Sequence, residues 1–200
     1  MAKLYFRYGA VGSAKTLNLL AVAHSYCQQH KRVIVLKPEL DTRFGTRWVK
    51  SRAGLEREAD LLVTPTTILP LERFRGVHCV LVDEAQFLGE HVVEQLRQVA
   101  TELGIPVICY GLRTDFRSRL FAGSRRLMEL ADEITEVKTT CCFCDRKAVF
   151  NLKLIGGLPT REGPVIDLGT EEKYQPACAR CYDTQLGGAF RETTDDKDQT

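Results

Sequence analysis

The sequence predicts an α/β fold with a mostly parallel sheet, followed by a small cysteine-rich unit. Two observations lead to this prediction: short apolar runs alternate with helical stretches along much of the chain, and five of the eight cysteines gather near the C-terminus. Strands that alternate with helices favour parallel pairing through right-handed crossovers. A chain of 200 residues is long enough for one such core and a small appendage.

The expected strands are short apolar or aromatic runs that end at polar or turn-forming residues. They are expected at 3–8, 33–36, 61–63, 77–82, 107–110 and 150–154. The run at 33–36 is apolar throughout, as in a strand that is buried on both faces. Helices are expected at 16–30 and at 91–103, where the second shows a helical apolar period that stops at Gly104 and Pro106.

The composition changes after about Lys138, where cysteines, glycines and prolines become frequent. We therefore expect an α/β domain at 1–138, a cysteine-rich domain at 139–191 and a polar, disordered tail at 192–200. The formal net charge of +2 provides no strong field toward nucleic acid or membrane. No apolar run approaches the ~18 residues of a membrane span, and the N-terminus lacks the apolar core of a secretory signal, so we expect a cytoplasmic protein.

Residues 9–16, GAVGSAKT, match the P-loop pattern except that Ala14 replaces the second glycine. The segment lies between an expected strand and an expected helix, where backbone N–H groups can hold phosphate oxygens. Lys15 is expected to neutralise the terminal phosphates, and Thr16 to offer its hydroxyl to Mg²⁺. The sequence leaves open whether the loop has its usual dihedral angles at Ala14. The predicted nucleotide-binding residues here are Gly9, Ala10, Val11, Gly12, Ser13, Ala14, Lys15 and Thr16.

An acidic pair, Asp83 and Glu84, follows the apolar run at 77–82. Because the carboxyl ends of parallel strands meet at one edge of a sheet, Asp83 is expected beside the phosphate loop, where it can organise Mg²⁺. Glu84 lies one residue further on and can remove a proton from the group that attacks the γ-phosphate. We therefore predict that Glu84 is the catalytic base.

The cysteines near the C-terminus form two CxxC pairs, Cys141 with Cys144 and Cys178 with Cys181. Such pairs are typical of a structural zinc site, which needs four thiolates. Cys142 could replace Cys141 as a ligand, although the spacing favours Cys141. The other cysteines are expected to be buried and unreactive: Cys27, Cys79 and Cys109.

Several segments, taken in order, resemble one family. These segments are GAVGSAKT at 9–16, DTRFG at 41–45, DEAQF at 83–87, YGLRTDF at 110–116, the two cysteine pairs, and EKYQPACARCY at 172–182. Together they resemble the type II thymidine kinases, a cytosolic, tetrameric family with a RecA-like core and a zinc-held loop called the lasso. The resemblance implies transfer of the γ-phosphate of MgATP to the 5′-hydroxyl of thymidine, for pyrimidine deoxynucleoside salvage and DNA synthesis.

The resemblance also implies roles for individual residues. Glu84 would take the proton of the 5′-hydroxyl, and Asp83 and Gln86 would belong to the ATP and metal site. Asp41 and Arg43 match a family motif near the phosphates, although Arg43 is equally compatible with a surface charge. The implied nucleoside-pocket residues are Phe87, Leu112, Phe116 and, from the lasso at about 165–174, Tyr174. A pocket lined by such apolar side chains suits a methylated pyrimidine ring.

Two family properties follow from the resemblance alone: a homotetramer and feedback inhibition by thymidine triphosphate. The sequence departs from the family's usual residues at Ala14 and at Asp167, where apolar residues are common. Four basic residues that follow the segment YGLRTDF are interpreted as solvent-exposed or interface surface: Arg117, Arg119, Arg125 and Arg126.

Two other functions are compatible with the same motifs. In a nucleic-acid-stimulated ATPase, Glu84 would activate water and the zinc unit would touch DNA, but the sequence has no dense basic stripe with interleaved aromatic residues. In a zinc-stabilised nucleotide sensor, Ala14 would mark lost catalysis. We expect thymidine and ATP, and no nucleic acid or membrane, as binding partners.

Overall fold

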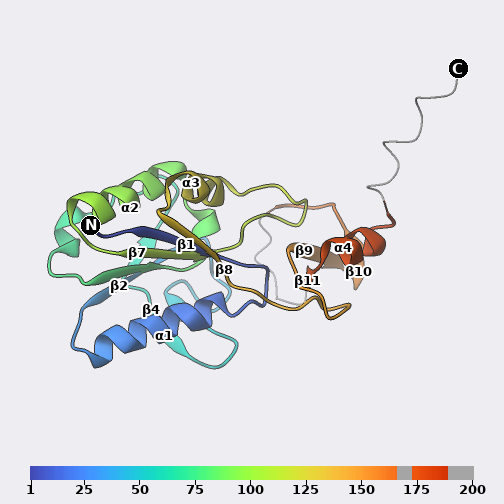
Figure 1. The fold of residues 1–200 in the computed structure, drawn as a ribbon, viewed down its shortest axis with the longest axis horizontal. Helices are drawn as coiled ribbons and strands as arrows, with labels where there is room; N and C mark the ends of the chain where they lie inside the picture. Colours follow the sequence, from blue (N-terminus) through green and yellow to red (C-terminus); the bar gives the residue numbers. More distant parts are fainter. Residues whose placement is uncertain (166–172, 189–200) are drawn as a thin grey trace, which may run out of the picture.

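The computed structural model describes residues 1–165 and 173–188. These residues form a six-stranded sheet and a three-stranded sheet, which lie toward opposite ends of the molecule (Figure 1). The predicted tail and most of the predicted lasso, including Asp167, lie outside the described residues.

The large sheet has the strand order β5-β2-β6-β7-β1-β8, and its neighbouring strands are parallel. Its strands are β1 (Leu4–Tyr8), β2 (Val33–Pro38), β5 (Leu61–Val63), β6 (Cys79–Val82), β7 (Val107–Gly111) and β8 (Glu133–Glu136). Every residue of β2, β6 and β7 is buried, as in strands that are covered on both faces. The predicted α/β fold with a parallel sheet is confirmed.

Helices cover both faces of the large sheet (Figure 1). One face packs against α1 (Lys15–Gln28), through side chains such as Leu19 and Leu20. The other packs against α2 (Glu90–Glu102) and α3 (Ala122–Leu130). The apolar runs and the helical period therefore correctly predict α1, α2 and five of the six strands.

The sequence does not predict β8 or α3. Strand β8, with the sequence EITE, lies at the edge of the sheet and is mostly exposed, so it has no apolar run. The buried face of α3 consists of Gly123, Ser124 and Leu127, of which only Leu127 has a large apolar side chain. Strand β8 is therefore held by pairing with β1 rather than by an apolar run of its own. Helix α3 is amphipathic but only nine residues long, and Met128 and Leu130 pack beside Leu127 against the core.

Shorter elements lie between β2 and α2. A hairpin is formed by β3 (Trp48–Lys50) and β4 (Glu56–Glu58), and two turns of 3₁₀ helix are η1 (Leu71–Phe74) and η2 (Ala85–Phe87). The hairpin contributes Trp48 and Lys50 to the wall of the main cavity, and η2 follows directly after β6. These elements therefore shape the site described below.

The small unit contains the antiparallel sheet β10-β9-β11. Its elements are β9 (Phe150–Ile155), β10 (Leu158–Thr160), β11 (Tyr174–Ala177) and α4 (Ala179–Gln185). The predicted strand at 150–154 is present, and a turn with positive φ at Gly156 and Gly157 joins β9 to β10. The core of the unit includes Leu152 and Tyr182, and Ala10 of the phosphate loop packs into it. The small unit thus supports the phosphate loop directly.

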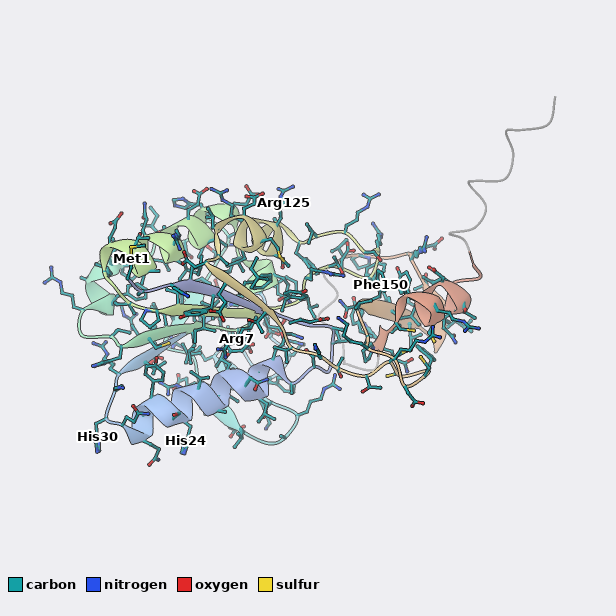
Figure 2. The ribbon with its side chains drawn as sticks, viewed as in Figure 1. Met1, Arg7, His24, His30, Arg125 and Phe150 are labelled. Carbon is teal, nitrogen blue, oxygen red and sulfur yellow. The ribbon has the colours of Figure 1, made fainter. Side chains whose placement is uncertain are left out.

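The prediction for Cys27 is wrong, whereas Cys79 and Cys109 are buried as predicted. Cys27 lies one turn beyond the buried Ala23, in the last turn of α1. There the guanidinium of Arg57 lies 3.5 Å from its sulfur, and Cys27 is exposed. His24 and His30, on the outer side of the same part of the chain, also point to solvent (Figure 2).

Among the described residues, no helix is both long and apolar enough to span a membrane.

Candidate active site

The phosphate loop joins β1 to α1 and holds the side chain of Lys15. The ammonium group donates to the carbonyl oxygens of Gly9 (3.1 Å) and Ala10 (2.8 Å) and to Oγ of Ser13 (3.2 Å). Burial lowers the pKa of Lys15 to about 8, although the nearby charges of Glu84 and Asp83 oppose this shift. The cation therefore lies at the N-terminus of α1, where a P-loop binds phosphate.

Ala14 adopts the left-handed conformation, with φ 60° and ψ 25°. For an L-residue other than glycine this conformation costs roughly 1–2 kcal/mol. Glycine would adopt this positive φ without strain, whereas Ala14 adopts it with a strained backbone.

Replacing Ala14 by glycine is expected to raise the free energy of unfolding by roughly 0.5–1 kcal/mol, because relief of strain exceeds the entropy gained by the unfolded chain. Urea unfolding followed by circular dichroism measures this change. The matched control is Ala21→Gly at an exposed position of α1, which should lower stability by about 1 kcal/mol. Equal destabilisation by the two substitutions would contradict the assignment of strain to Ala14.

Thr16 and Asp83 lie side by side at the edge of the sheet. Oγ1 of Thr16 is 3.2 and 3.3 Å from the two carboxylate oxygens of Asp83, which follows β6. Burial raises the pKa of Asp83 to about 7, and the negative charge of Glu84 adds to this shift. Because a bound divalent cation favours the ionised carboxylate and Mg²⁺ prefers oxygen ligands, this pair fits a magnesium site.

Glu84 is held through both of its carboxylate oxygens. Oε1 accepts from Arg43, and Oε2 accepts from the side-chain amide of Gln86 at 2.5 Å. Arg43 in turn donates to Asp41 at 2.7 and 3.2 Å, while Gln86 accepts from the backbone N–H of Leu112 at 2.9 Å. Glu84 itself has φ 49°, a left-handed conformation. The carboxylate is therefore fixed from two directions.

The charges of Glu84, Arg43 and Asp41 favour the ionised forms of Arg43 and Asp41. The negative charge of Glu84 raises the pKa of the Arg43 guanidinium. Burial acts to raise the pKa of Asp41, but hydrogen bonds and the positive charge from Arg43 prevail and lower it. The three side chains therefore form an alternating chain of charges beside the phosphate loop.

One cavity of about 290 Å³ is lined by residues 11–16 of the phosphate loop and by Glu84, whereas Gly9 and Ala10, whose carbonyls bind Lys15, are not among its lining residues. Asp83 and Gln86 line it as well. The residues predicted for the nucleoside pocket line the same cavity: Phe87, Leu112, Phe116 and Tyr174. The phosphate loop and the apolar side chains therefore face a common space.

Sequence reasoning missed several residues that line this cavity. Trp48 and Phe121 contribute apolar surface, and the Phe121 ring packs edge-on against Phe87 at 5.7 Å between centroids. Asn151 accepts from the backbone N–H of Val11 and donates to the carbonyl of Thr114, both at 2.9 Å. In the alternating pattern of residues 150–154, Asn151 stands at a position that is usually exposed to solvent, so the sequence gives no sign that it lines a site. It is buried because the phosphate loop packs over it.

The basic residues after β7 have different environments. Arg125 of α3 points outward (Figure 2) and pairs with Glu90 of α2. Arg126 of α3 pairs with Glu94 of α2 at 2.8 Å. These two are surface residues, as predicted. Arg117, although exposed, donates to main-chain carbonyls of the small unit. The surface interpretation is therefore incomplete for Arg117.

Four cysteine sulfurs of the small unit lie within 4.8 Å of one another: those of Cys141, Cys144, Cys178 and Cys181. The sulfur of Cys144 is 3.6 Å from those of Cys178 and Cys181. Tetrahedral zinc with Zn–S bonds of ~2.3 Å needs sulfur separations of ~3.8 Å, so the cluster fits that ion. Cys142 is exposed and stands outside this group, so the geometry favours Cys141 as the ligand.

A phosphate loop, an acidic pair at a strand end and an adjoining apolar pocket define the class of P-loop nucleotide-binding enzymes. The family model described as "Thymidine kinase" matches residues 2–182. The chain belongs to the thymidine kinase family, and the resemblance noted in the sequence is confirmed.

Relatives named thymidine kinase align with 91% of this chain. The protein of Lactiplantibacillus plantarum is 46% identical, with 96% of its own length covered. Those of Enterococcus faecalis and Streptococcus gordonii are 44% and 43% identical, with 95% and 96% covered. The solved structure of Pif1 helicase from Candida albicans aligns with 68% of this chain and with 36% of the helicase chain. The sequence identity is 15% and the TM-score is 0.42, so this similarity carries no argument about function.

Proposed function

We propose that this protein transfers the γ-phosphate of ATP to the 5′-hydroxyl of thymidine and forms thymidine monophosphate. The observation that carries the proposal is the single cavity that contains both the Lys15 loop and Glu84. Membership of the thymidine kinase family supports thymidine as the acceptor.

In this mechanism Glu84 removes the proton of the 5′-hydroxyl as its oxygen attacks the γ-phosphorus. The new oxygen–phosphorus bond forms while the bond to the β-phosphate oxygen breaks, and ADP leaves. Arg43 and Gln86 hold the two oxygens of the Glu84 carboxylate and so orient it toward the acceptor. Lys15 and the loop N–H groups stabilise the charge that develops on the phosphates.

Thr16 and Asp83 would hold a magnesium ion, which would supply positive charge to the phosphates. Their 3.2 Å contact beside the phosphate loop supports this assignment. Phe87, Leu112, Phe116 and Tyr174 would enclose the thymine ring, because aromatic and aliphatic walls suit a methylated base. The Phe116 and Tyr174 rings lie 6.3 Å apart between centroids, close enough to form one wall.

The remaining assignments belong to the same proposal. A structural zinc ion is held by Cys141, Cys144, Cys178 and Cys181 in a lasso domain at 139–191, separate from an ATP-binding domain at 1–138. The protein works in the cytoplasm as a homotetramer and is inhibited by thymidine triphosphate. Similarity to the type II thymidine kinases supports these last points.

Incubation with γ-labelled ATP and thymidine tests the proposal. We expect label on thymidine in proportion to enzyme and time, and little free phosphate when thymidine is omitted. Parallel reactions with water alone and with DNA serve as controls. Free phosphate released only with DNA would instead indicate a nucleic-acid-stimulated ATPase, and no transfer in any reaction would indicate a nucleotide sensor.

A further inference from the structure

Two cations from different parts of the chain converge on the ring of Phe116. Lys153 belongs to β9 of the small sheet, whereas Arg117 follows Phe116 in the loop after β7. The Lys153 ammonium lies 4.6 Å from the ring centroid and the Arg117 guanidinium carbon 5.2 Å. Within about 6 Å a cation over an aromatic face is attracted to it. Both cations therefore hold the buried Phe116 ring in place.

The same two cations also bind the main chain of 161–164. Lys153 donates to the carbonyl of Pro164 at 3.1 Å. Arg117 donates to the carbonyls of Arg161 at 3.0 Å and Gly163 at 2.7 Å. Hydrogen bonds from charged donors are roughly twice as strong as neutral ones. Val165 follows this segment directly and lines the cavity. These bonds therefore hold the main chain that leads to Val165.

Lys153 is completely buried, which is unusual for a lysine. It pairs in register with Tyr174 of β11 on one side and Thr160 of β10 on the other. Tyr174 also lines the cavity, so Lys153 lies where Phe116, Tyr174 and the chain leading to Val165 meet.

Gly163 permits the close approach of the Lys153 ammonium. It has φ +92°, and a Cβ built on it would lie 2.9 Å from Nζ of Lys153. A larger residue would be strained by its backbone and would crowd the ammonium group. The segment is therefore shaped around this buried cation.

We infer that Lys153, together with Arg117, is a positioning residue for the nucleoside side of the site. It fixes Phe116 and the chain at 161–165 against each other, and so presets one wall of the pocket before thymidine binds. The inference rests on the proposed function, which assigns Phe116 and Tyr174 to the base. Its effect should appear in thymidine binding rather than in ATP binding, because the phosphate loop holds Lys15 by its own carbonyls.

Steady-state kinetics of Lys153→Met tests this role. Methionine has a similar length and suits a buried site, so the fold should persist. We expect KM for thymidine to rise about tenfold, a factor that corresponds to about 1.4 kcal/mol. The KM for ATP should stay within about twofold and kcat within about threefold, the pattern of lost uniform binding. Lys153→Arg, which keeps the charge, should recover most of the thymidine affinity.

Arg117→Met provides a second test at an exposed position that does not endanger folding. It should raise KM for thymidine about threefold, because it removes two main-chain hydrogen bonds. The matched controls are Lys147→Met, an exposed lysine of the small unit paired with Glu136, and Arg119→Met, both expected to match the unmodified enzyme. Zinc content and the melting temperature report whether each variant folds, and if Lys153→Met does not fold, Arg117→Met decides.

Equal rises in both KM values, or no change in either, would overturn the inference. If the unmodified enzyme phosphorylates thymidine but the variants lack this split, only the positioning role fails. If the unmodified enzyme does not phosphorylate thymidine, both proposals fail.

Discussion

Replacing Glu84 by glutamine is expected to lower kcat by on the order of a hundredfold or more, the usual scale for the loss of a general base. The amide has nearly the same size, but it cannot accept the proton of the 5′-hydroxyl. Binding of ATP should be retained, because the phosphate loop and Lys15 are unchanged. Single-turnover transfer from labelled ATP and a separate titration of ATP binding measure the two effects.

Glu90→Gln is the control for this substitution. Glu90 is a surface acid at the start of α2 that pairs with Arg125, and its loss should leave turnover unchanged. Glutamine at position 84 meets the same left-handed backbone as glutamate but loses the ion pair with Arg43, so the melting temperature is measured alongside kcat to show that the variant is folded. Near-normal turnover of a folded Glu84→Gln enzyme would remove Glu84 from the role of base.

Replacing Cys141 by serine is expected to abolish zinc binding and most of the activity. Structural zinc contributes apparent binding energies of about 10–16 kcal/mol in small zinc domains, and a lost thiolate breaks the tetrahedral set. The core of the small unit is small and includes Cys141 and Cys178 themselves. Metal analysis of the purified protein and the thymidine kinase assay measure both losses.

The small unit also reaches the active site, which explains why activity should fall with the zinc. Tyr182 donates to the carbonyl of Phe116 at 2.5 Å, and Asn151 accepts from the N–H of Val11 in the phosphate loop. Tyr174 of β11 lines the cavity. Disorder of the unit would therefore disturb both the cavity wall at Phe116 and Tyr174 and the phosphate loop.

Cys142→Ser is a closely matched control, because it removes the neighbouring thiol from an exposed position. It should retain about one zinc ion per chain, as expected for a site with four other thiolates, and normal activity. Zinc retained by Cys141→Ser but lost from Cys142→Ser would reverse the ligand assignment. Full activity of a zinc-free Cys141→Ser enzyme would contradict the structural role of the small unit.

Much of the fold is readable from local patterns. Residues 33–36 of β2 and the whole of β6 are uninterrupted apolar runs, and α2 has a clear helical period, because both faces of the strands and one face of the helix are buried. Strand β8 and helix α3 are not readable in this way. An exposed edge strand has no apolar run, and a nine-residue helix that packs partly through glycine and serine offers only a short apolar face.

The chemical groups of the site are also marked by local motifs. The P-loop, the acidic pair and the two CxxC pairs each place their residues within a few positions of one another, so spacing alone indicates which groups can act together. The structure brings Lys15 and Glu84, which lie far apart in sequence, to one cavity, as the expected parallel sheet requires.

The sequence by itself therefore determined the class of fold, the phosphate loop, the acidic pair and the cysteine pairs, because these depend on residues that are close along the chain. Only the tertiary structure decided that Cys27 is exposed, that Cys141 rather than Cys142 joins the cysteine cluster, and that Lys153 is buried. The physical reason is that burial and partners depend on what distant segments cover. Lys153 has the sequence pattern of an exposed residue on an alternating strand, yet Phe116 and the chain at 161–164 enclose it.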